Sequence, residues 1–320
     1  ILIRILQILI FVGAGFVIYS ELQKNKESLN FDGILKHLLT FNGIMILIIV
    51  FLGQFLNWWL ESLKFRALIS KTEAINKWDA IKSVYAGNAI GVLTPNKVGT
   101  FIGRALYLKE KDTVSVISST MLGNVAQLTT TALFGLFGFL FIVSFGSQLN
   151  FINQGFPIYA LLISFILLLL LGILFFYPSF LYKLALKLPF ISRFADRISY
   201  FKYFSKKELL TALAFSVLRY IVFAFQFILL LKLLHVNITI ISLCAFICVL
   251  YMIVTFIPSP FMGNLGTREA VVLLLLANYN STAEVLSASI ILWGINVAFP
   301  AIVGSLIFLF DKVKLKRHIK

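Results

Sequence analysis

Long runs of apolar residues, separated by short polar stretches, recur along the whole 320-residue chain. Each run is long enough to cross the ~30 Å hydrocarbon core of a bilayer as a helix. The pattern therefore predicts an all-α polytopic membrane protein with about six full transmembrane helices. The predicted ranges are 3–19, 41–60, 115–143, 157–177, 209–234 and 286–310.

Two further apolar regions, 84–109 and 238–278, are each interrupted by proline and glycine residues. The apolar legs that follow these breaks, 98–109 and 267–279, are short. A leg of about a dozen residues rises roughly 18 Å as a helix, which is about half of a bilayer. We therefore expect each region to form a re-entrant helical hairpin.

The charges between the helices predict the orientation of the chain. Lysine and arginine residues concentrate in segments 61–83 and 178–208 and in the C-terminal tail, whereas segment 144–156 carries no charge. Cytoplasmic loops carry an excess of these residues, so the first three segments are expected in the cytoplasm and 144–156 outside. The loop 20–40 then lies outside despite its three lysines, which the rule does not favour.

This orientation gives the two predicted hairpins opposite topology. The hairpin 84–109 enters from the cytoplasmic side, and 238–278 enters from the outer side, so their tips should meet near the midplane as in inverted-repeat transporters. We expect one transmembrane domain, 1–320, with no separate soluble part. Its predicted parts are a motif-bearing unit at 41–177, an amphipathic interfacial linker at 178–208 and an inverted motif-bearing unit at 209–310.

Composition agrees with a protein of the cytoplasmic membrane whose C-terminus faces the cytoplasm. The chain is 60% hydrophobic, has a mean hydropathy of +0.97 and carries a net charge of +15. In a soluble protein such a charge would favour nucleic-acid binding, but here it follows from the positive-inside rule, so no nucleic-acid partner is expected. The first run has no cleavage site after it and is interpreted as a membrane helix, not as a signal peptide.

The strongest candidate chemistry lies at the two helix breaks, in the repeated patterns Gly99-x4-Arg104 and Gly263-x4-Arg268. A half-helix N-terminus carries unpaired N–H groups and a partial positive charge, which favour an anion. Arginine adds a permanently charged fork suited to phosphate. A structural role, in which each arginine pairs with Glu269 or with carbonyl groups of the facing hairpin, is the alternative.

Four other polar residues lie in apolar segments. Lys97 is a second phosphate contact or extends to the interface, and Arg219 lines a cavity or extends to the cytoplasm. Glu269, interpreted as the only carboxylate well inside an apolar region, carries a coupling proton, binds a cationic headgroup or neutralises an arginine. Asn88 is a candidate for ligand contact or for a hydrogen bond between helices. The candidate substrate-binding residues are Arg104, Arg268, Lys97, Glu269, Gly99, Gly263, Arg219 and Asn88.

An enzymatic function is not expected. The three histidines lie far apart, and the sequence contains no paired carboxylates, no zinc motif and no phosphate-binding loop for ATP hydrolysis. We therefore expect no catalytic residue, no metal ligand and no cofactor.

The residues around the two breaks resemble the lysylphosphatidylglycerol synthase transmembrane-region family over nearly the whole chain. The second motif is close to the Pro-Gly-Gly-x-Gly-x-Arg-Glu of that family, whereas in the first Pro-Asn-Lys replaces the usual Pro-Gly. The motifs that carry the resemblance are Tyr85-Ala86-Gly87-Asn88, Thr94-Pro95-Asn96-Lys97-Val98-Gly99, Gly103-Arg104, Pro258 and Gly263-Asn264-Leu265-Gly266-Thr267-Arg268-Glu269-Ala270.

The resemblance implies a lipid flippase that translocates a phospholipid or another anionic lipid such as a polyprenyl phosphate. The soluble aminoacyl-transfer domain of full-length synthases is not expected in this chain, so lipid synthesis is not implied. Together with the two arginine-bearing helix breaks, the resemblance predicts transport of an anionic, phosphate-bearing lipid across the cytoplasmic membrane. The alternatives are a non-transporting scaffold or accessory subunit for an envelope lipid or glycan synthesis enzyme, and a lipid-modifying enzyme. The expected protein partners are a second copy of the chain or an envelope enzyme.

Overall fold

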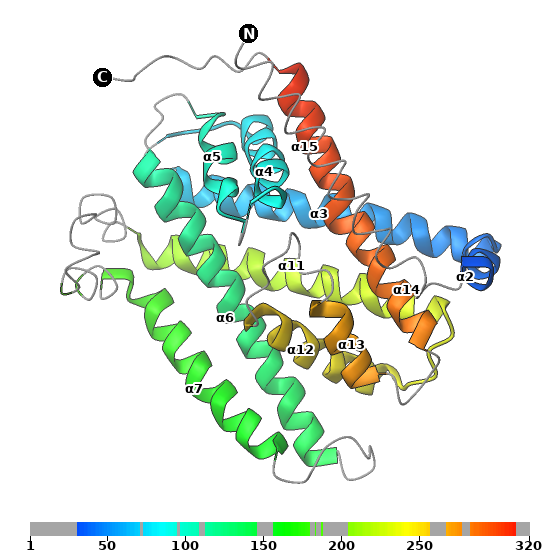
Figure 1. The fold of residues 1–320 in the computed structure, drawn as a ribbon. Helices are drawn as coiled ribbons and strands as arrows, with labels where there is room; N and C mark the ends of the chain where they lie inside the picture. Colours follow the sequence, from blue (N-terminus) through cyan, green and yellow to red (C-terminus); the bar gives the residue numbers. More distant parts are fainter. Residues whose placement is uncertain are drawn as a thin grey trace.

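The computed structural model describes residues 31–70, 73–94, 97–108, 113–145, 156–179, 204–256, 267–276 and 282–311, together with Lys183 and Lys187. The regular structure of these residues is entirely helical, as predicted (Figure 1). The helices are α2 (Phe31–Leu38), α3 (Phe41–Ile69), α4 (Lys77–Val92), α5 (Gly99–Ala105), α6 (Thr113–Phe145), α7 (Phe156–Phe176), α11 (Lys206–Leu233), α12 (Ile240–Phe256), α13 (Thr267–Leu276), α14 (Thr282–Trp293), the π-helix η6 (Gly294–Ala298) and α15 (Phe299–Phe310).

Within these described ranges, four helices are long and apolar enough to cross a membrane. They are α3, α6, α11 and the continuous unit formed by α14, η6 and α15. α7 and α12 contribute shorter apolar stretches. The predicted helix 3–19 and most of the predicted linker 178–208 lie outside the described residues, as does Gly263.

Two antiparallel helices, α3 and α11, lie side by side across the molecule (Figure 1). Their contact is polar as well as apolar: Gln226 on α11 donates a hydrogen bond to the carbonyl oxygen of Val50, at 2.6 Å. A Cβ atom at Gly53 would lie 3.0 Å from the amide nitrogen of Gln226, so glycine permits this close approach. Such hydrogen bonds and small residues are the usual means by which helices associate in a membrane.

The helical hairpin of α4 and α5 is packed tightly enough to require glycine. A Cβ atom at Gly103 would lie 2.5 Å from the carbonyl oxygen of Ala86, which no side chain could tolerate. Lys97, just before α5, has a φ of 57°, in the left-handed region typical of tight turns. α15 covers the other side of α4, where a Cβ atom at Gly304 would lie 2.1 Å from the carbonyl oxygen of Tyr85.

The second interrupted region is built from α12 and α13, which pack against each other. α12 also lies along α6, where Met252 and the carbonyl oxygen of Ala245 approach Gly135 and Gly138 closely. α7 packs on the outer side of α6 (Figure 1). The described residues thus form one helical body around α3 and α11.

Two contacts mark the ends of this body. Lys82 on α4 forms an ion pair of 2.7 Å with Asp311 at the end of α15. Near the start of α3 and the end of α11, the rings of His37 and His235 lie with their centroids 4.7 Å apart. The first pair brings together segments predicted to be cytoplasmic, and the second brings together segments predicted to be outside.

The predicted end of the helix 41–60 is wrong. α3 continues to Ile69, and Glu61 and Lys64, assigned from the sequence to a cytoplasmic loop, are buried inside the protein at 4% and 1% exposure. The charges do not end the helix because the protein pairs them. The last predicted helix likewise begins earlier than expected, at Thr282 instead of residue 286.

Candidate functional site

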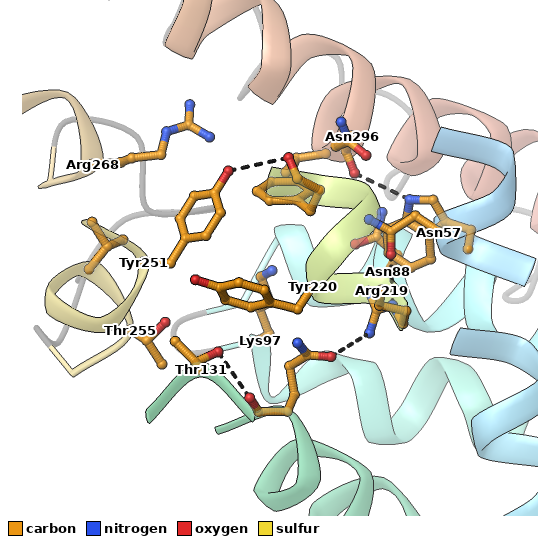
Figure 2. Close-up of a pocket in the computed structure, with 15 residues that line it drawn as sticks. Asn57, Asn88, Lys97, Thr131, Arg219, Tyr220, Tyr251, Thr255, Arg268 and Asn296 are labelled. Carbon is orange, nitrogen blue, oxygen red and sulfur yellow. Dashed lines mark hydrogen bonds between the residues drawn. The ribbon is translucent and has the colours of Figure 1, made fainter. Parts of the chain in front are cut away.

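A pocket of about 310 Å³ lies where α3, α4, α6, α11, α12 and η6 converge (Figure 2). Each of the four long helical units contributes from its middle turns: Asn57 in α3, Gln127 in α6, Arg219 in α11 and Asn296 in η6. The pocket therefore lies about halfway along the helices that are long enough to cross a membrane. Ligand sites of many transporters lie at this depth.

Among the described residues, three cationic side chains and no carboxylate line the pocket. Lys97 comes from the turn before α5, Arg219 from the middle of α11 and Arg268 from the first turn of α13. Figure 2 shows Arg268 and Arg219 on opposite sides of the pocket, with Lys97 between them. A site of this charge favours an anion.

Behind one wall of the pocket, a single buried carboxylate holds three cations. Glu61 accepts hydrogen bonds from Arg104 at 2.6 Å, from Lys64 at 2.8 Å and from Arg219. We call these four residues the Glu61 cluster. Since one negative charge faces three positive charges, the cluster is net positive, and Arg219 links it to the pocket.

Arg219 is held on two sides within the described structure. Its Nε donates to the side-chain oxygen of Asn57 at 2.7 Å, and its NH1 contacts Glu61 and, at 3.4 Å, the side-chain oxygen of Gln127. These partners come from α3 and α6, so the position of the guanidinium depends on both helices. An anion in the pocket would compete with Glu61 for the same charge.

Arg104 lies in the wall, not on the surface of the pocket. It is 5% exposed, pairs with Glu61, lies 3.5 Å from the hydroxyl of Thr120, and stacks its guanidinium 4.8 Å from the ring centre of Phe65. Such a contact with an aromatic face stabilises a buried cation. The sequence predicts that Arg104 and Arg268 both contact the ligand. In the structure only Arg268 lines the pocket, and Arg104 lies behind its wall.

Arg268 forms its ion pair with its own neighbour in sequence. Its NH2 donates to Glu269 at 2.9 Å and to the carbonyl oxygen of Ser289 at 2.7 Å, and the hydroxyl of Ser289 donates to Glu269 at 2.8 Å. Of the roles considered for Glu269, this geometry matches the neutralising one. The interpretation that Glu269 is the only carboxylate inside an apolar region is wrong, because Glu61 is equally buried.

The π-helix η6 results in part from a proline and places an amide on the pocket wall. Pro300 has no N–H group to donate to the carbonyl oxygen of Asn296 four residues earlier. This oxygen instead accepts a hydrogen bond of 3.3 Å from the indole nitrogen of Trp58, and the N–H of Phe299 bonds to Gly294 five residues back. π-Helical turns are frequent at functional sites.

The structure brings together four of the eight candidate residues around one pocket: Lys97, Arg219, Arg268 and Asn88. Arg104 and Glu269 lie behind them as ion-pair partners. Gly99 is buried, and a Cβ atom at this position would lie 2.5 Å from the carbonyl oxygen of Ile90. In the structure this glycine therefore permits the close packing of α4 and α5.

Sequence reasoning missed the polar face of α3. Gln54, Asn57, Glu61 and Lys64 are spaced by three, four and three residues, which places them on one side of a helix. All four are buried. Gln54 donates to the hydroxyl of Tyr85 on α4, whereas the other three contact α11. This spacing was the available signal. The prediction missed this face because the predicted helix 41–60 stops just before Glu61, the first charged residue of α3.

Comparison with known protein families agrees with the family resemblance of the two helix-break motifs. The model of the lysylphosphatidylglycerol synthase TM region matches residues 4–304, which is nearly the whole chain. A search of curated proteins found no match. Since the family model covers the two interrupted regions and the long helices between them, the chain belongs to the lysylphosphatidylglycerol synthase TM region family of membrane proteins.

Proposed function

We propose that this protein binds the anionic, phosphate-bearing headgroup of a lipid in the pocket and moves that lipid across the cytoplasmic membrane. The observation that carries the proposal is the set of three cations, Lys97, Arg219 and Arg268, around a pocket whose described lining includes no carboxylate. Family membership supports a role connected with membrane lipids.

The depth of the pocket supports transport over simple binding at a membrane surface. Charged side chains in the middle of a bilayer are costly, so proteins retain them there chiefly for function. The Glu61 cluster compensates only part of the positive charge. A phosphate group would neutralise much of the rest, and its oxygens match the planar fork of arginine.

The two interrupted regions are proposed to be re-entrant hairpins of opposite topology. Gly99–Ala105 has seven residues and Thr267–Leu276 has ten, lengths of roughly 10 and 15 Å as helices, which are too short to cross a ~30 Å hydrocarbon core. Lys97 and Arg268 stand at the starts of these short helices, and both line the pocket. This arrangement supports two half-helices that meet at the ligand.

The proposal is a transporter and not an enzyme. Glu61 is occupied by three cations, and Glu269 is occupied by Arg268 and Ser289, so neither carboxylate is free to act as a general base at the pocket. The competing function is a scaffold or accessory subunit for an envelope enzyme. It would not require a mid-depth anion site.

Lipid retention by Lys97→Gln tests the proposed site. Lys97 is exposed and belongs to none of the ion pairs among the described residues, so the variant should fold normally. Loss of one charged hydrogen-bond donor should weaken lipid binding by about tenfold or more. Mass spectrometry of lipids that co-purify with the two proteins measures this, with Lys77→Gln at the start of α4 as the control. Equal amounts of anionic lipid on wild type and Lys97→Gln would contradict the site.

The predicted orientation is tested by single cysteines introduced at Lys36 and Lys77 after Cys244 and Cys248 are replaced by serine. Both lysines are exposed and lie toward opposite ends of the helical body. An impermeant thiol reagent added to intact cells should label residue 36 and should label residue 77 only after the membrane is opened. Labelling of residue 77 in intact cells would overturn the proposed orientation of the first hairpin.

A further inference from the structure

The last membrane helix has two halves that pack against different interrupted regions. α14, η6 and α15 follow one another along the chain, with the π-helical turn between the two α-helical halves. α15 packs on α4 of the first interrupted region, whereas α14 packs on α13 of the second and on α11 (Figure 1). Any relative movement of the two regions must therefore bend this helix or break one of these contacts.

The contact between α15 and α4 is too close to allow sliding. A Cβ atom at Gly304 would lie 2.1 Å from the carbonyl oxygen of Tyr85, so the two backbones touch at this point. Further along, Lys82 on α4 forms its ion pair of 2.7 Å with Asp311 at the end of α15. α15 and α4 should therefore move as one unit.

α14 is joined to α13 by buried polar contacts. Arg268 donates to the carbonyl oxygen of Ser289 at 2.7 Å, and the hydroxyl of Ser289 donates to Glu269 at 2.8 Å. Arg268 and Glu269 are 5% and 4% exposed, so separation of the helices would leave buried charged groups with fewer partners, which is costly. α14 and α13 should therefore move as a second unit.

The turn between the two units has weaker helical bonding than its neighbours. The N–H of Phe299 bonds to Gly294, five residues back instead of the four of an α-helix, and Pro300 has no N–H to donate. A Cβ atom at Gly294 would meet no other atom within 4 Å, so packing does not fix this residue. Proline and π-helical turns are the usual causes of helix kinks.

A contact with α3 keeps this turn in place while its two sides differ in their neighbours. The indole nitrogen of Trp58 on α3 donates to the carbonyl oxygen of Asn296 at 3.3 Å. The middle of the last helix is thereby attached to a long helix that belongs to neither unit. This is the arrangement of a pivot.

We infer that η6 is a hinge, at which α15 together with α4 tilts relative to α14 together with α13. Lys97 lies between α4 and α5, and Arg268 lies in the first turn of α13, so the tilt changes the spacing of two pocket walls. The inference deepens the proposed function, because a carrier needs two arrangements of one pocket to open it to each side in turn. The hinge itself is measured without transport.

The test measures distances between pairs of spin labels by pulsed electron paramagnetic resonance, on the full chain in phosphatidylcholine liposomes. Cys244 and Cys248 are first replaced by serine, and cysteines for the labels are placed at exposed positions. Ala270 and Phe310 form the pair across the hinge, and Lys77 and Phe310 form the control pair within the α4–α15 unit. The pair across the hinge should give two separated distances, and the control pair should give one.

Gly294→Ala should favour one of the two distances by about fivefold, which is the preference of alanine over glycine inside a helix. The variant should fold, because the added Cβ meets no atom within 4 Å. Gly172→Ala in α7 is the matched control: it is the same substitution with equally open surroundings, and it should leave the ratio of the two distances as in the wild type.

A single narrow distance for the pair across the hinge, as for the control pair, would overturn the inference even if the protein moves lipid. Two distances whose ratio responds equally to Gly294→Ala and Gly172→Ala would also overturn it, because the movement would then not occur at η6. Two distances with the expected response, in a protein that moves no lipid, would support the hinge and overturn the proposed function.

Discussion

Glu61→Gln is expected to lower the stability of the folded protein by about 3–5 kcal/mol, the usual cost of removing one partner from a buried ion pair. The substitution would leave Lys64, Arg104 and Arg219 close together with no carboxylate between them. Three helices, α3, α5 and α11, meet at this carboxylate, so their packing should loosen together. Thermal unfolding in detergent measures the change.

A second substitution separates charge from packing. In the double variant Glu61→Gln/Arg104→Gln, one cation leaves with the carboxylate, so part of the lost stability should return. Lys206→Gln, at the exposed start of α11, is the control that also removes one charge, and it should change stability by less than about 0.5 kcal/mol. If Glu61→Gln unfolds at the wild-type temperature, the Glu61 cluster does not hold these helices together.

Arg268→Gln is expected to reduce lipid transport by about 100-fold, because it removes a charged two-pronged donor from the pocket. Arg268→Lys should restore only part of the rate, since an ammonium group retains the charge but not the planar fork. Transport of a fluorescent anionic lipid in proteoliposomes measures both variants.

The neighbouring carboxylate makes a further variant necessary. Arg268→Gln removes the arginine that forms an ion pair with Glu269, and the loss of this buried pair is expected to destabilise the fold. The double variant Arg268→Gln/Glu269→Gln removes both charges and should fold, yet it should transport as poorly as the single variant. Wild-type transport by the double variant would mean that Arg268 does not bind the lipid.

Much of the fold could be predicted because a run of consecutive apolar residues is enough to identify a membrane helix. The apolar runs at 115–143 and 209–234 correspond to α6 and α11 within a few residues. The end of α3 could not be predicted in the same way. Its charged residues are stable inside the protein because Glu61 meets Arg104 and Arg219, which are 43 and 158 residues away in the chain.

The candidate site likewise contains residues that local sequence identifies and residues that only tertiary contacts identify. Lys97, Arg219 and Arg268 were recognisable because a cation in an apolar segment is costly. Their grouping around one pocket agrees with that reasoning, and their role in binding stays a prediction. Asn296 was not recognisable, because its position on the wall depends on the π-helical turn before Pro300 and on Trp58 from a distant helix.

Lipid movement by the purified protein alone tests the central claim most directly. Liposomes that contain the protein and a trace of phosphatidylglycerol with a fluorescent acyl chain are treated with dithionite, which destroys only the dye in the outer leaflet. The account predicts that nearly all fluorescence is lost, because lipids from the inner leaflet reach the outer one, and that Arg268→Gln/Glu269→Gln liposomes lose only the outer-leaflet share. Loss of only that share from wild-type liposomes, as from liposomes without protein, would contradict transport and favour the scaffold.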